Sequence, residues 1–434
     1  MGAGHSWSDV ALTDGLLLEP DNLSGLIELD DGSLRQRADG PPLVRVRGGT
    51  HLRDLNAALD ALGLALPNMG GYDAQTIGGV VSTSTHGSGI AFGPFPDLVR
   101  SLDLVIAGGE VVRVEPVDGL TDPLRFSSVD GIAAHLIQDD DTFAAAICGM
   151  GCLGLIASLV IEVREKFWLN EVRTLSTWEA VREHLTVADL QAAGEHWELF
   201  VNPYAGEDGN HRLLVTVRTP CPEPVHLPPD KLERHPLTEL ASSLPLTGVL
   251  LRWYIALFPK SLPGRFDQVL ADMRDDGYAS VSYKVFNIGA PNDLPAYSME
   301  LGVSVEDGSH VVAVDRILEM AERRRREDGI YQTSPFSLRF VAPSRAYASM
   351  MHGRATMMIE LIMVKGTRRG EELIAGYEAA LADLGVRAHW GQINALTPAD
   401  LPRLYPEWPR WKAVHDAFNS SGVFASPFTK RVGI

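Results

Sequence analysis

The chain has 434 residues, 45% of them hydrophobic and 22% charged, so it is long enough for two domains with sizeable buried cores. Its formal net charge of −18 argues against a polyanionic partner such as nucleic acid. The three cysteines are too few for a disulfide framework or a metal-binding quartet, and no secretory signal pattern is visible. We therefore expect a reducing, cytoplasmic setting and no metal site.

The chain opens on a glycine-rich motif, Gly2-Ala-Gly-His-Ser6. Glycines let a backbone approach a phosphate closely and leave N–H donors free, and His5 is placed to contact whatever those phosphates carry. Such a motif normally follows a strand, and none precedes it in this chain. We therefore expect an N-terminal lead-in of this domain to be missing.

The next elements are a strand and an amphipathic helix. Residues 43–47 alternate apolar and charged side chains, which indicates a half-exposed strand. Leucines then recur at helical spacing over residues 52–62. Thr50 is the expected N-cap of this helix, and Gly63 is expected to end it in a left-handed conformation.

An uncharged stretch over residues 143–161 follows a predicted hairpin whose strands, 102–107 and 111–115, flank Gly108-Gly109. By length alone the stretch could cross a membrane. Three glycines crowd its middle, however, and its second half is rich in β-branched residues. We favour a glycine turn that leads into a buried strand over residues 155–163.

The composition changes after about residue 165. Strands over 197–202 and 213–218 flank a polar turn and predict a second hairpin, and prolines cluster at 220–245, as in a segment crossing the surface. Interspersed strands and helices without a βαβ rhythm predict an antiparallel sheet with helices on one face. Further strands are expected at 280–287, 297–305, 336–341 and 356–363, and helices at 140–147, 310–327 and 370–384.

The loop over residues 78–89 is the densest polar segment of the chain. It holds four glycines and five hydroxyl side chains and ends in His86-Gly87-Ser88-Gly89. Its backbone N–H groups and short hydroxyls suit an anionic ligand, although it has neither a Walker nor a Rossmann pattern. An ordinary polar loop is the alternative for this segment alone. Together with residues 2–8 and 149–154 it makes three such loops, which favours a cofactor that carries a diphosphate.

These loops resemble the flavin domain of the vanillyl-alcohol-oxidase (PCMH-type) family, and His389-Trp-Gly391 and Tyr405-Pro-Glu-Trp408 resemble its sugar-lactone and alditol oxidase branch. The resemblance implies an α+β fold with a two-subdomain FAD-binding domain over residues 1–165. It also implies an α+β substrate-binding cap domain with an antiparallel sheet over 166–395. A C-terminal segment, 396–434, would return to the FAD-binding domain.

The same resemblance implies an FAD-dependent oxidoreductase that acts on a CH–OH group of a sugar lactone, polyol or related alcohol and passes electrons to O2 or another acceptor. His5 matches a histidine that is often bonded covalently to the flavin in this branch; a capping histidine is the alternative. The implied cofactor-binding residues are Gly2, Ala3, Gly4, His5, Ser6, Gly79, Ser82, Thr83, His86, Gly87, Gly151, Gly154 and Ile156.

The implied catalytic residues depart from the branch at two positions. The branch commonly has a Glu-x-Arg pair and a lysine after His-Trp-Gly, whereas this chain has Ser337-Leu-Arg339 and Gln392. Arg339 keeps a permanent cation, and Gln392 can donate a hydrogen bond, but Ser337 is no general base by itself. His389 could remove the proton or could be a packing residue. Glu360 could replace the missing acid or could point outward from its strand.

These departures leave a second interpretation open. A flavin-binding protein with weak or no catalysis would also lack the carboxylate and the lysine. Reduction of bound flavin by an alcohol would separate the two.

Overall fold

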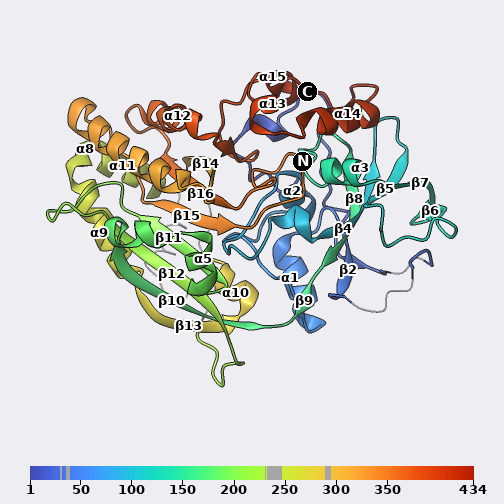
Figure 1. Ribbon diagram of the computed structural model, residues 1–434, viewed down its shortest axis with the longest axis horizontal. Helices are drawn as coiled ribbons and strands as arrows, with labels where there is room; N and C mark the ends of the chain where they lie inside the picture. Colours follow the sequence, from blue (N-terminus) through green and yellow to red (C-terminus); the bar gives the residue numbers. More distant parts are fainter. Residues whose placement is uncertain (30–31, 36–39, 230, 232–246, 289–294) are drawn as a thin grey trace.

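The computed structural model describes residues 1–29, 32–35, 40–229, 231, 247–288 and 295–434, and two large β-sheets dominate it. One sheet has seven strands drawn from residues 26–162, and the other has eight strands drawn from residues 168–388. The seven-stranded sheet lies at the right of Figure 1 and the eight-stranded sheet at the left.

The seven-stranded sheet is mostly antiparallel. Only β5 and β7 run parallel; the other neighbours are antiparallel. The hairpin predicted at Gly108-Gly109 is confirmed, and both glycines have positive φ. In spatial order the strands are β1 (Leu26–Ile27), β2 (Leu43–Arg47), β8 (Leu155–Glu162), β4 (Val99–Val105), β5 (Val111–Glu115), β7 (Ile132–Gln138) and β6 (Ser128–Val129). Its helices are α1 (Leu52–Ala61), α2 (Ile77–Ser82) and α3 (Asp140–Ala146), and a short pair, β3 (Leu64–Ala65) and β9 (Arg164–Glu165), stands apart.

The uncharged stretch 143–161 is divided between the end of α3, a glycine turn and β8. Gly151 and Gly154 take φ values of +75° and +148°, which side chains with a Cβ rarely adopt. β8 pairs with a strand on each side, and its residues 158–161 are buried, whereas residues 155–157 are half-buried. The predicted buried strand is confirmed, and no helix among the described residues is long and apolar enough to span a membrane.

The eight-stranded sheet is antiparallel throughout, as predicted. In spatial order its strands are β13 (Asp275–Val281), β10 (Trp168–Thr177), β12 (Arg212–Cys221), β11 (His196–Val201), β15 (Phe336–Val341), β16 (Thr356–Val364), β14 (Ala296–Ser304) and β17 (Arg387–Ala388). The helices predicted over 310–327 and 370–384 are observed as α11 (Ser309–Asp328) and α12 (Gly370–Ala380).

Side chains alternate between the two faces of this sheet. Leu338, Ile359 and Leu301 are fully buried on the face beneath α11 and α12, which pack on β14 and β16. Their strand neighbours Arg339 and Glu360 point to the opposite face, since successive side chains of a strand alternate. That opposite face meets the loop over residues 78–89, where Gly89 donates its N–H to the Phe340 carbonyl at 2.6 Å.

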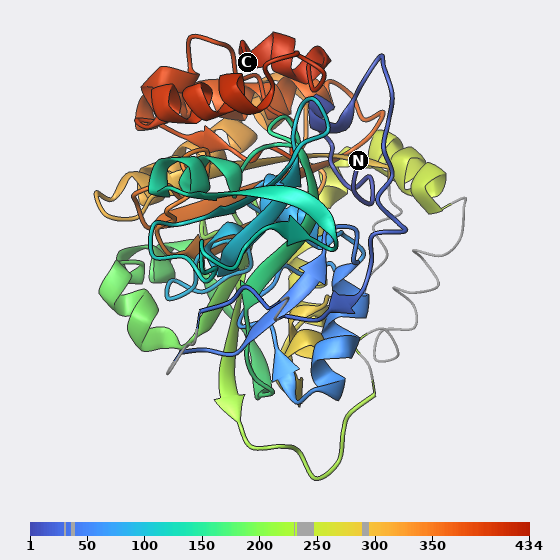
Figure 2. The same ribbon diagram turned by 90° about the vertical axis from the view of Figure 1, so that its right-hand side faces the viewer.

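Three C-terminal helices return to the seven-stranded sheet: α13 (Leu401–Leu404), α14 (Trp408–Phe418) and α15 (Pro427–Val432). They appear in red above that sheet in Figure 2. The Trp411 indole donates to the Cys148 carbonyl at 3.1 Å, and α15 is held to the N-terminal segment by the ion pair of Arg431 with Asp9 at 2.6 Å.

Two local predictions are wrong. The segment 280–287 continues as a strand only to Val281 and then forms α10 (Ser282–Phe286). The N-cap of α1 is His51, because the Thr50 hydroxyl instead donates to the Arg47 carbonyl and accepts from the Gly25 N–H.

Of the predicted proline-rich crossing, residues 230 and 232–245 lie outside the described residues. The other α-helices of the described residues are α4 (Trp178–Val181), α5 (Val187–Ala193), α8 (Thr247–Leu257) and α9 (Leu262–Asp272).

Candidate cofactor and active site

A cavity of about 290 Å³ lies where the N-terminal segment, α2 and the glycine turn before β8 meet, and residues 423–429 complete its wall. Eleven of the thirteen residues predicted to hold the cofactor line it: Gly2, Ala3, Gly4, His5, Ser6, Gly79, Ser82, Thr83, Gly151, Gly154 and Ile156. Three loops that are far apart in the sequence therefore form one wall.

Close backbone packing explains the glycines of this wall. A Cβ on Gly2 would stand 2.4 Å from the Thr76 hydroxyl, and one on Gly78 would stand 2.7 Å from the Gly48 carbonyl. A Cβ on Gly48 would in turn stand 2.3 Å from the Ile156 carbonyl. Larger residues would push the loops apart and reshape the cavity.

The chemistry of the cavity fits FAD. Its described lining residues include no Asp, Glu, Lys or Arg, although the chain holds 56 acidic residues. A wall free of carboxylates avoids repelling a diphosphate, while hydroxyls and backbone N–H groups can bind it. Apolar residues such as Val10, Met150 and Phe424 supply a surface for aromatic rings.

His5 lies in the cavity wall, with its ring edge-on to Tyr72 at a centroid distance of 4.7 Å. Burial lowers the pKa of His5, and the nearby His51 and Arg53 lower it further. The imidazole is therefore neutral at neutral pH and keeps a nucleophilic lone pair.

The N-terminal segment is fastened to the His-Trp-Gly motif. Trp7 donates its N–H to the Gly391 carbonyl at 2.8 Å, and the Ser8 hydroxyl donates to the Trp390 carbonyl at 2.5 Å. Gln392 follows at once and is buried, and its carboxamide oxygen has no partner among the described residues. An unpaired buried acceptor beside the segment that lines the cavity fits a site that binds a polar group.

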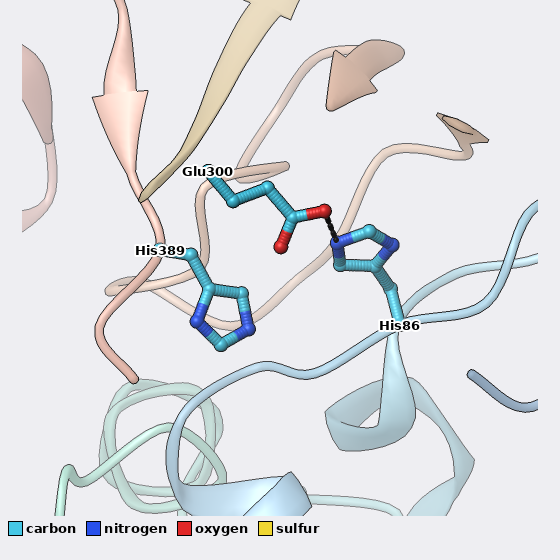
Figure 3. Close-up of side chains that lie close together, drawn as sticks. All are labelled: His86, Glu300 and His389. Carbon is cyan, nitrogen blue, oxygen red and sulfur yellow. Dashed lines mark ion pairs between the residues drawn. The ribbon is translucent and has the colours of Figure 1, made fainter. Parts of the chain in front are cut away.

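His86 and Gly87 lie outside the cavity lining. A Cβ on Gly87 would stand 2.3 Å from Asn68 Oδ1, so this glycine allows close packing behind the loop. His86 instead reaches the eight-stranded sheet, where its Nε2 lies 3.3 Å from Glu300 Oε1 (Figure 3).

Five side chains on the polar face of the eight-stranded sheet form what we call the polar floor: Glu198, Glu300, Ser337, Arg339 and Glu360. Arg339 is its centre, with Nε 2.8 Å from Glu198, and Nη1 3.0 Å from Glu360 and 3.5 Å from Glu300. The strand register brings them together, since Glu198 is opposite Arg339 and Glu360 is opposite both Ser337 and Glu300.

The polar floor is strongly electrostatic. Burial by itself would lower the pKa of Arg339, but Glu360, Glu198 and Glu300 together raise it above its usual value. Burial would likewise raise the pKa of Glu300, but His86, His389 and Arg339 outweigh it and lower that pKa to about 2. Both groups are therefore fully charged at neutral pH.

His389 stands beside Glu300 and His86, and Figure 3 shows the three side chains converging. Each residue has one atom able to bind a metal ion, a ring nitrogen or a carboxylate oxygen, and these three atoms lie within 4.8 Å of one another. The His389 Nδ1, however, accepts the Gly391 N–H at 3.0 Å, so a neutral ring carries its proton on Nε2. Burial, with smaller effects of His86 and Arg339, lowers the pKa of His389 to about 4 despite the opposing charge of Glu300.

Sequence reasoning missed Glu198 and Glu300. Each is a single carboxylate inside an otherwise apolar strand, Trp197-Glu-Leu-Phe and Met299-Glu-Leu. Burying a carboxylate without a partner is costly, so a lone glutamate in an apolar strand points to a buried cation nearby. Glu198 and Glu300 carry this signal just as Glu360 does. Which cation partners it is a matter of strand register and could not be seen in the sequence.

The comparisons with known proteins agree with this geometry. Residues 1–115 match the FAD binding domain family, and residues 160–432 match the D-arabinono-1,4-lactone oxidase family. L-gulono-1,4-lactone dehydrogenase of Mycobacterium tuberculosis is 27% identical over all of this chain and 89% of its own length. Alditol oxidase of a Streptomyces strain is 26% identical over 99% of this chain and 88% of its own length.

Among solved structures, the fold resembles that of cholesterol oxidase from Brevibacterium sterolicum, with a TM-score of 0.73. The match covers all of this chain and 88% of that one at 15% identity, which shows the fold alone.

The fold and the cavity thus define an FAD-dependent oxidoreductase of the PCMH type that acts on CH–OH groups. The expected fold class and cofactor are confirmed. The chain belongs to the D-arabinono-1,4-lactone oxidase family.

Proposed function

We propose that the substrate is a sugar lactone, a polyol or a related small polyhydroxylated alcohol. The observation that carries this proposal is the polar floor, where charged and hydroxyl groups offer many hydrogen bonds to substrate hydroxyls. A sterol would cover this charged surface with hydrocarbon and offer it a single hydroxyl, whereas a polyol or lactone offers several hydrogen bonds. The names of the two bacterial relatives support the same class.

We also propose a division of the chain into a cofactor domain, residues 1–165, a substrate domain, 166–395, and a closing segment, 396–434. The two sheets and the return of α14 onto α3 support these limits. The glycines and hydroxyls that line the cavity would hold FAD, which would supply an acceptor for the hydride of the substrate. Electrons would then pass to O2 or another acceptor. The three free cysteines support a cytoplasmic setting.

In this proposal Arg339 binds and orients substrate hydroxyls, because it is the only permanent cation of the polar floor. Ser337 donates its hydroxyl to Glu360 at 3.2 Å and positions that carboxylate. Gln392 would hydrogen-bond the cofactor through its carboxamide, whose oxygen has no partner among the described residues, and His389 would present its Nε2 proton toward the site as a donor. His86 holds Glu300 in place.

The test is reduction of the bound flavin without oxygen. The purified holoprotein is mixed with L-gulono-1,4-lactone, D-arabinono-1,4-lactone, xylitol or cholesterol, and loss of the yellow colour is followed. We expect bleaching by at least one polyhydroxylated compound and none by cholesterol. Bleaching by cholesterol alone would overturn the substrate class, and a yellow protein that no alcohol bleaches would favour the flavin-binding protein without catalysis.

We further propose that His5 is bonded covalently to the flavin. The neutral imidazole supports this, because its lone pair is available as a nucleophile. Acid precipitation should leave the yellow colour in the pellet for the wild-type protein. In His5→Ala the colour should move entirely to the supernatant.

The matched control is His135→Ala, since His135 is an exposed histidine on β7, away from the cavity. Its colour should stay in the pellet. A colourless wild-type pellet, with all flavin in the supernatant, would show that the cofactor is held without a covalent bond.

A further inference from the structure

The three carboxylates around Arg339 differ in how much of their bonding capacity is already used. Glu198 has both oxygens engaged, Oε1 with Arg339 at 2.8 Å and Oε2 with Arg218 at 3.1 Å. Although burial opposes it, the charges of Arg339 and Arg218 hold the pKa of Glu198 below its usual value. A carboxylate fixed between two arginines is a weak proton acceptor.

Glu300 is also already paired with neighbouring side chains. Its Oε1 faces both His86 and Arg339, and its side chain is only 5% exposed. With a pKa of about 2 it releases a proton readily and holds one poorly at neutral pH. Its role is to carry a fixed negative charge between the two domains.

Glu360 is the carboxylate with capacity left. Its side chain is 15% exposed, three times as much as the other two. Its Oε2 accepts from Ser337 at 3.2 Å and faces Arg339 at 3.0 Å, whereas its Oε1 has only a long contact of 3.4 Å with the Ser298 hydroxyl. One oxygen is thus anchored while the other remains able to accept a proton.

The competing proton acceptors are poorly placed. The His389 Nδ1 lone pair is occupied by the Gly391 N–H, so its free nitrogen already carries hydrogen. Ser337 donates its hydroxyl to Glu360 in a hydrogen bond and is no general base at neutral pH.

We infer that Glu360 is the catalytic residue that takes the hydroxyl proton of the substrate, with Arg339 and Ser337 as its positioning residues. The inference rests on the proposed alcohol oxidation. The substrate O–H bond breaks and its proton goes to Oε1 of Glu360, while the C–H bond breaks and its hydride passes to FAD. The electron pair of the O–H bond forms the new C=O bond, so the substrate loses two electrons and one proton is left on the protein.

The first variant is Glu360→Gln, which keeps the shape and removes the proton acceptor. At saturating lactone we expect the rate constant of anaerobic flavin reduction to fall by about 10²–10⁴-fold, as for loss of a general base. Two readouts that do not depend on turnover should stay unchanged: the flavin content, and the rise in melting temperature caused by L-gulono-1,4-lactone. The control Glu110→Gln removes an exposed carboxylate from a turn and should change none of these values.

The second variant exchanges the two register partners, as the double substitution Ser337→Glu and Glu360→Ser. Because these residues face each other across β15 and β16, the exchange returns a carboxylate beside Arg339 from the neighbouring strand. We expect a reduction rate at least about tenfold above that of Glu360→Gln, a gain equivalent to about 1.4 kcal/mol of barrier. Glu360→Asp, with a shorter carboxylate, should also fall between the wild type and Glu360→Gln.

The outcomes separate this inference from the proposed function. A wild-type protein that no lactone or polyol reduces would refute the proposed function and the inference with it. Reduction of the wild type and Glu360→Gln at equal rates would refute the role of Glu360 alone. Unchanged saturated rates with a lost lactone-induced melting shift would make Glu360 a binding residue and would also overturn the inference.

Discussion

Replacing Arg339 with alanine is expected to lower the free energy of unfolding by about 3–5 kcal/mol at neutral pH, the range for breaking a buried ion pair by removing one partner. The reason is that Glu198, Glu300 and Glu360 would then face one another without their shared cation. The same variant should retain FAD but lose flavin reduction by alcohols, because the cation that binds substrate hydroxyls is gone. Urea unfolding and anaerobic bleaching measure the two effects.

The control for Arg339→Ala is Arg410→Ala. Arg410 also has acidic neighbours, Asp141 at 3.3 Å and Glu407 at 3.2 Å, but its side chain is 57% exposed. Exposed pairs of this kind contribute little to stability, because water screens them. Equal urea midpoints for the two variants would contradict the central role of Arg339, and loss of FAD from Arg339→Ala would make its role structural.

The pH dependence of stability should carry the signature of Glu300. Its pKa is about 2 in the folded chain and 4.5 in the unfolded chain, so the folded state favours its charged form. The stabilisation is present above pH 4.5 and is lost as the pH falls toward the lowered folded pKa. The difference in unfolding free energy between wild type and Glu300→Gln should therefore shrink as the pH is lowered from 6 to 2.

His389 adds acid sensitivity over a higher range. Burial holds the pKa of His389 at about 4 in the folded chain, against 6.5 in the unfolded chain. Between these two pH values the unfolded chain therefore binds a proton that the folded chain does not bind. Stability from this group is present above pH 6.5 and falls as the pH drops toward 4. Glu110→Gln serves again as the control and should parallel the wild type at every pH. A wild-type difference from Glu300→Gln that does not vary with pH would contradict the low pKa of Glu300.

Local patterns predicted most of the elements. The alternation in residues 43–47, the leucine spacing of α1 and the glycine turn at 108–109 each depend on neighbours within a few residues, and all three elements appear where expected. The prediction that the strand at 43–47 is half-exposed is wrong, because Arg45 is buried and pairs with Asp103 at 2.8 Å. The strand expected over 280–287 ends early because β13 pairs with β10 only as far as Val281. Where a strand stops is decided by its partner, which lies more than a hundred residues away.

The cofactor loops could be predicted for a similar reason. Glycines and hydroxyls mark a backbone that can approach a phosphate, and eleven of thirteen such residues line one cavity. His86 has the same sequence context but crosses to Glu300, because the loop's end passes beneath the eight-stranded sheet. Spacing along the loop cannot distinguish these two directions.

The sequence by itself thus determined the α+β class and the three phosphate-type loops, since each is a property of residue type and short-range spacing. The departures at Ser337 and Gln392 followed from the resemblance to the oxidase branch. Only the tertiary structure decided that Glu360 stands opposite Ser337 and that three carboxylates share Arg339. The physical reason is register: a shift of one residue between β15 and β16 would turn Glu360 to the apolar face. The carboxylate that the motif lacks is present, but it comes from the neighbouring strand.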